Sequence, residues 1–164
     1  MRGAVVLVLV VAGVFSLAAC GGEENASDTS EAPTAAIRGE PIVIRMRKLV
    51  ALEERTEPIA TGDVLEGSTL GGSPFCTGGT VRDSHGSSDP TVWLIIETIT
   101  CADGTVKLRL EPDPSPGLTQ TGSWTIATGT GTFAQLRGSG KMEAVYDPDP
   151  TEPAHVTLTG AVTR

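Results

Sequence analysis

The sequence predicts an all-β fold, either a sandwich or a barrel, and three observations support this prediction. Apolar and polar residues alternate with a period of two in several short segments, as they do in strands with one buried face. Segments rich in glycine and proline separate these runs, as turns do between the strands of all-β domains. A helical period of 3.6 residues is not sustained after the N-terminal segment. About seven or eight strands and little helix are therefore expected.

The first strands are expected within residues 41–72. In residues 41–47, "PIVIRMR", isoleucine and methionine alternate with arginine, which predicts a strand with one buried face. Residues 48–56 either continue this strand or form one helical turn, and residues 62–72 hold another strand.

The middle of the domain predicts a central hairpin. Residues 91–100, "TVWLIIETIT", are apolar on both sides of a strand, as in a strand covered on both faces. Asp103 and Gly104 follow as a hairpin signal. We therefore expect residues 92–101 and 105–111 to pair antiparallel.

Three further strands with period-two alternation are expected in the C-terminal third, at residues 123–127, 140–146 and 155–163. Three segments contain proline, which cannot donate a backbone hydrogen bond inside a sheet. They are predicted to be loops, at residues 83–90, 111–117 and 147–153.

The N-terminus predicts export and membrane attachment. Residues 1–19 have a charged start, a short apolar run and small residues at the end, which is typical of a signal peptide. The sequence "LAAC" ending at Cys20 resembles the bacterial lipobox. The resemblance implies cleavage before Cys20 and lipidation of this cysteine, unless the chain is an ordinary secreted protein in which Cys20 is incidental. Because several acyl chains hold durably, we expect a lipid anchor on the extracytoplasmic face of the cell membrane.

The rest of the chain divides into a tether and one domain. Residues 20–37 are small, acidic and poor in large apolar residues, so they cannot offset the entropy of ordering and predict a disordered tether. Residues 38–164 form the domain. The whole chain has a net charge of −8, and an acidic protein repels nucleic acid, so no nucleic-acid partner is expected.

The remaining cysteines, Cys76 and Cys101, predict a disulfide. They are an even pair in a chain expected in an oxidising compartment. The alternative is a metal site, but two thiols without Cys-x-x-Cys spacing and only two histidines fit it poorly. No metal is expected.

A glycine-rich segment, residues 122–140, raises the question of a cofactor. Gly129, Gly131 and Ala134 have the spacing of a dinucleotide-binding loop. Such a loop must open a helix, and the six residues before Gly138 are too few for one. We therefore expect these glycines to turn the chain, with Phe133 and Leu136 plugging an end of a barrel, and we expect no cofactor.

The same segment resembles a known family. Gly122-Ser123-Trp124, then residues 129–133, "GTGTF", and then residues 138–140, "GSG", are similar to a run in allene oxide cyclase-like and dirigent-like proteins. The resemblance covers residues 118–164 well and residues 42–111 in outline. It implies a small antiparallel β-barrel of about eight strands with a central cavity. The catalytic residues of these families cannot be carried over, because the matched motif holds glycines and aromatics.

Glu97 is the one weak catalytic candidate. It lies in an apolar segment on the side of Trp93, Ile95 and Ile99, and a carboxylate in an apolar lumen would have a raised pKa. The alternative is that Glu97 pairs with Arg109 across the hairpin or reaches solvent. Two histidines give weaker signals: His85 lies in a segment expected to turn, and His155 lies on the polar side of a strand.

Three classes of function remain open: a binding module for a small apolar ligand, a structural surface lipoprotein with a filled barrel, and an isomerase or cyclase. The sequence favours them in this order. The lining of the barrel separates the classes. The expected lining residues are Trp93, Trp124, Met142 and Tyr146.

Overall fold

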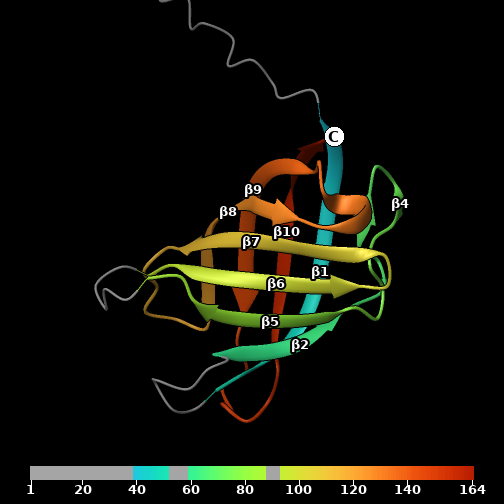
Figure 1. Cartoon of the computed structure of the whole chain (residues 1–164). Coiled ribbons are helices and arrows are strands. Elements are labelled where there is room, and N and C mark those ends of the chain that lie inside the picture. The colour runs from blue at the N-terminus through green and yellow to red at the C-terminus, as the bar shows by residue number, and fades with distance from the viewer. Residues whose placement is uncertain (1–38, 52–58, 88–92) are drawn as a thin grey trace, which may run out of the picture. The chain divides into compact units, whose positions relative to one another are not determined.

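The computed structural model describes residues 39–51, 59–87 and 93–164, which form a small all-β barrel (Figure 1). One 3-10 turn, η1 (Gly131–Phe133), accompanies the strands. The strands are β1 (Glu40–Val50), β2 (Ala60–Val64), β3 (Thr69–Leu70), β4 (Ser73–Pro74), β5 (Thr80–His85), β6 (Ile95–Cys101), β7 (Gly104–Pro112), β8 (Thr119–Gly129), β9 (Arg137–Val145) and β10 (Ala154–Thr163).

Eight of these strands close the barrel. They pair antiparallel in the order β1-β2-β5-β6-β7-β8-β9-β10, and β10 pairs back onto β1. The short strands β3 and β4 form a hairpin beside the first part of β1. Figure 1 shows β2, β5, β6 and β7 in front, with the remaining barrel strands crossing behind them. The predicted small antiparallel barrel of about eight strands is confirmed.

Several predicted elements are found with changed limits. The hairpin is confirmed, because β6 pairs with β7 up to the Cys101–Gly104 pair. However, β6 begins at Ile95, later than predicted. Residues 48–50 continue β1, and residues 62–72 contain the end of β2 and all of β3. The predicted signal peptide, Cys20 and the predicted tether lie outside the described residues. In the part of the chain that the structure describes, no helix is long and apolar enough to cross a membrane.

The interior of the barrel holds one apolar core to which every barrel strand contributes. Trp124 fills the space between β8, β9 and β10, because Gly140 and Gly160 stand next to it across the sheet. A Cβ atom on Gly160 would lie 2.7 Å from Cζ2 of Trp124. The indole N–H donates to the carbonyl oxygens of Lys141 (3.1 Å) and Thr159 (3.2 Å). The glycines therefore make room for the indole.

The end of the barrel where β1 begins, here called the closed end, is filled with apolar side chains. Phe133 and Leu136, from η1 and the residues after it, are buried there, as predicted. Phe133 meets Phe75 edge to face, with ring centroids 5.6 Å apart. The predicted Cys76–Cys101 disulfide is present at the same end and joins the loop after β4 to the end of β6.

Candidate functional site at the mouth of the barrel

The opposite end, here called the mouth, is where β1, β5, β7 and β9 end. Three charged side chains enter the interior near this end: Lys48 from β1, Asp83 from β5 and Glu97 from β6. Their side chains are 5%, 5% and 0% exposed. Together they are called the polar cluster below.

Strand alternation explains why these side chains point inward. Lys48 follows Ile42, Ile44 and Met46 at every second position of β1, and these three residues are buried in the core. Asp83 lies directly opposite Glu97 in the β5–β6 pairing, so the two carboxylates share one face of the sheet.

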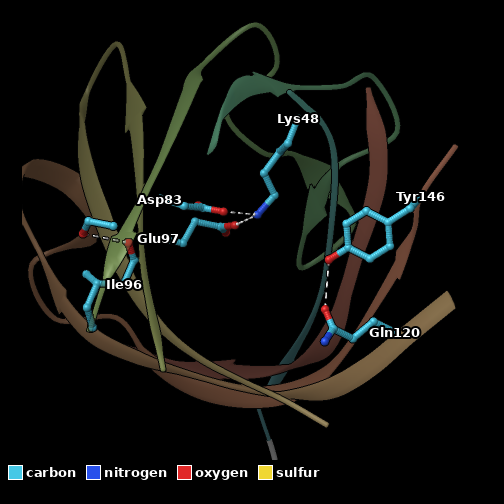
Figure 2. Close-up of polar contacts among 7 residues, drawn as sticks. Lys48, Asp83, Ile96, Glu97, Gln120 and Tyr146 are labelled. Carbon is cyan, nitrogen blue, oxygen red and sulfur yellow. Dashed lines mark hydrogen bonds and ion pairs between the residues drawn. The ribbon is translucent and has the colours of Figure 1, made fainter. Parts of the chain in front are cut away.

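Small residues on β2 let Lys48 reach across the wall of the barrel. β2 lies between β1 and β5, and its residue opposite Lys48 is Gly62. The residue opposite Asp83 is Ala60. Without large side chains at these two positions, the stem of Lys48 passes over β2 and places its ammonium at the carboxylates (Figure 2).

Lys48 is the shared partner of both acids. Its Nζ donates to Oδ2 of Asp83 at 2.9 Å and to Oε2 of Glu97. The other oxygens of these carboxylates, Oδ1 of Asp83 and Oε1 of Glu97, are buried and have no hydrogen-bond partner. Such atoms are rare in folded proteins, because a buried acceptor without a donor costs roughly 1–3 kcal/mol.

In the polar cluster, the pKa values of Glu97 and Lys48 both lie above their ordinary values. Burial raises the pKa of Glu97 to about 7, with a smaller contribution from the charge of Asp83, although Lys48 opposes both. Burial alone would lower the pKa of Lys48, but the charges and hydrogen bonds of Glu97 and Asp83 together hold it above its ordinary value. Lys48 therefore stays charged at neutral pH, whereas Glu97 exchanges its proton there.

A second polar pair faces the cluster across the interior. The hydroxyl of Tyr146 donates to Oε1 of Gln120 at 2.9 Å (Figure 2). The amide Nε2 of Gln120 donates to the carbonyl oxygen of Asp113 at 3.2 Å. Burial raises the pKa of Tyr146, while the charge of Lys48 lowers it. The mouth is thus lined with polar groups from both sides.

The structure contradicts the alternative in which Glu97 pairs with Arg109 or reaches solvent. Glu97 is buried, but Arg109 does not pair with it: Arg109 Nε donates to Glu111 Oε1 at 2.8 Å, and both side chains are about half exposed. Arg109 lies next to Ile96 in the sheet, so it belongs to the outer face.

The expected lining residues separate into two groups. Trp124 and Met142 are buried in the core, and Tyr146 is partly buried against it. Trp93 is 69% exposed and precedes β6, so its assignment to the lining is wrong.

Two residues of the cluster were missed in the sequence. Lys48 continues the inward alternation of β1, which was a usable signal, but a lysine near a strand end is ordinarily solvated. Asp83 was assigned to a loop at residues 83–90. This assignment is wrong for residues 83–85, because β5 extends to His85. His155 is exposed on β10, as expected.

Two cavities lie along the outer wall. One, of about 530 Å³, is lined by β1, β2 and β5 and includes Arg47, Asp63 and Arg82. The other, of about 370 Å³, is lined by residues of β8, β9 and β10 and includes Lys141 and Glu143. Among the described residues, no group of three or more histidine, cysteine, aspartate or glutamate side chains could hold a metal ion.

Comparisons with protein-family models, curated proteins and solved structures found no match to this chain.

Proposed function

We propose that this protein is a membrane-tethered binding barrel, held by lipid on Cys20 at the extracytoplasmic face, that takes up a small molecule with an apolar body at its mouth. The anchor rests on the signal-like N-terminus and the "LAAC" sequence before the tether. Binding at the mouth rests on the polar cluster.

One observation carries the binding proposal: two carboxylate oxygens, on Asp83 and Glu97, are buried without a donor. A core needs no such groups, since replacing a buried ion pair by apolar residues of similar volume is often neutral or stabilising. Buried polar groups that converge on one place in an apolar barrel are typical of a ligand site. A ligand that donates hydrogen bonds would satisfy both oxygens.

The experiment is mass spectrometry of small molecules extracted from the purified soluble chain, residues 21–164. Wild type should carry a small molecule that is absent after Asp83→Asn and Glu97→Gln, and retained after Glu143→Gln, which changes an acid of the outer wall. The same bound material in all of these proteins would contradict a site at the mouth. The anchor is tested separately: Cys20→Ser should remove the full chain from the membrane lipoprotein fraction, and equal recovery would contradict lipidation.

A structural role is the second candidate, because the interior near Trp124 is packed with core side chains. In that case extraction yields no bound molecule, and the three variants differ from wild type only in stability. Catalysis by Glu97 would require a substrate that reaches the same buried oxygens, so the same extraction is its first test.

A further inference from the structure

The large apolar side chains that the barrel exposes gather at one end. In the described part of the chain they lie at the end of β1, before β6, before β8 and at the end of β9, which all meet at the mouth. They are Leu49, Val50, Trp93, Leu118 and Val145. Leu49 and Val145 follow the inward-facing Lys48 and Ala144, so they lie on the outer face. Val50, Trp93 and Leu118 are called the rim below. Single exposed apolar side chains are common on protein surfaces, so these residues support an interaction site only together with the polar cluster beside them.

The rim continues the inner wall outward. Val50 and Leu118 each stand two residues from an inward-facing polar residue of the mouth, Lys48 and Gln120 respectively. Leu118 is held against the site by its backbone, since its carbonyl oxygen accepts from the N–H of Tyr146 at 2.8 Å. Apolar surface therefore lies outermost and polar atoms lie deeper.

The space below the polar cluster is occupied. Met46, Val81 and Ile99 lie one inward-facing position deeper than Lys48, Asp83 and Glu97 on the same three strands, and they are 2% exposed or less. A ligand that reaches the free oxygens of Asp83 and Glu97 therefore has its polar group deepest, and its apolar part remains at the rim. In a barrel that binds an apolar tail in its interior, the apolar part of the ligand lies deepest, so the arrangement here is the reverse.

The charges select the kind of polar group. With both acids ionised, two carboxylates face one ammonium, so the cluster has an excess of one negative charge. Two acceptors are free. A hydroxyl brings one donor and no charge, whereas a primary ammonium brings three donors and one positive charge.

We propose that the mouth binds an amphiphilic primary amine head first, with the ammonium on Asp83 Oδ1 and Glu97 Oε1 and the apolar part on the rim. This inference rests on the proposed function and names the chemistry of its ligand.

Binding of a cation is linked to the ionisation of Glu97. The charged or titratable groups that face it are Lys48 from β1, Asp83 from β5 and Tyr146 after β9, and His85 stands two residues from Asp83. Because Glu97 has a pKa of about 7 and must be ionised to hold the ammonium, affinity rises with pH. Between pH 6 and pH 8 the gain is about tenfold, while an alkylamine with a pKa of about 10 stays charged.

The test compares four probes with one chain length on the soluble wild-type chain: octylamine, 1-octanol, octyltrimethylammonium and octanoate. Titration calorimetry gives affinity and proton release, and the fluorescence of Trp93 reports on the rim. We expect octylamine to bind at least tenfold tighter than the other three, with release of about half a proton at pH 7 and close to one proton at pH 6. Glu97→Gln and Asp83→Asn should each weaken octylamine at least tenfold, and Glu143→Gln should leave it unchanged.

Three results would overturn the inference. Equal binding of 1-octanol and octylamine would leave a binding barrel without selection for an ammonium, so the proposed function would survive. Equal binding of octyltrimethylammonium, which has no N–H donor, would mean that the site selects a positive charge and forms no hydrogen bonds with the ligand. Binding of no probe would mean that the two oxygens are satisfied without a ligand, by a proton shared between the two carboxyl groups or by water. If Glu97→Gln does not fold, the four probes and the comparison of affinity at pH 6 and pH 8 still test the inference on the wild-type chain.

Discussion

At the scale of single residues, Gly131 controls the turn at the closed end. Its φ is 60°, a conformation that side-chain-bearing residues rarely adopt, and a Cβ there would overlap the carbonyl oxygen of Asp103. We expect Gly131→Val to lower the free energy of unfolding by roughly 1–3 kcal/mol or more. Thermal melting of the soluble chain measures this.

The matched control is Gly117→Val. A Cβ added to Gly117 would meet no atom within 4 Å, and this glycine does not have a positive φ. This variant should melt close to wild type. If both variants melt alike, the turn at Gly131 does not depend on glycine.

Glu97 makes stability depend on pH in a direction opposite to that of most acids. Its folded pKa is about 7, above the ordinary value of 4.5, so the folded protein binds a proton that the unfolded chain has released. Its contribution to stability is complete below about pH 4.5 and is lost as the pH rises to about 7.

The measurement is urea unfolding of wild type and Glu97→Gln between pH 4.5 and pH 9. The stability of wild type relative to the variant should fall by a few kcal/mol up to about pH 7 and then level off. A difference that grows with pH over this range would show that the pKa of Glu97 is lowered in the folded protein.

At the scale of elements, the disulfide joins two parts of the closed end. Cys76 and Cys101 are 25 residues apart in sequence, and the bond holds the loop after β4 against the β6–β7 hairpin. On the chain-entropy model a bond closing such a loop stabilises by roughly 3 kcal/mol. Cys76→Ser with Cys101→Ser should lose about this much in urea unfolding.

Reduced wild type serves as the control for this loss, because it lacks the bond but keeps both side chains. It should unfold at the same urea concentration as the double variant. Titration of unreduced, denatured protein should find no free thiol, and two free thiols would contradict the bond.

The strands were predictable where one face is buried by apolar residues. β7 and β10 alternate clearly between buried and exposed positions, so their pattern was sufficient. β5 was not predicted, because Val81 is its only buried apolar residue and Asp83 on the same face resembles a loop residue. A buried acid is acceptable there only because Lys48, from a distant strand, reaches it.

At the scale of the whole molecule, the sequence favoured a barrel or a sandwich without deciding between them. Closure depends on the pairing of β1 with β10, more than 100 residues apart, and no local pattern encodes it. The polar cluster also depends on tertiary structure. Glu97 alone was a candidate, whereas its partners come from β1 and β5, which lie on either side of β2, and no local pattern shows that Lys48 crosses β2 at Gly62.

Closure by the first and last strands also makes the position of the chain ends arbitrary. Glu40 lies opposite Val162, and Arg164 forms an ion pair with Glu40 at 3.9 Å. A short glycine-serine linker from Arg164 to Gly39 would turn the β1–β10 seam into an ordinary hairpin. New ends could then be opened between Ser115 and Pro116, in an exposed connection between β7 and β8. This circular permutant should fold to the same barrel, with an unchanged circular dichroism spectrum and one cooperative melting transition. Loss of that transition would show that the original order of strands is required for folding.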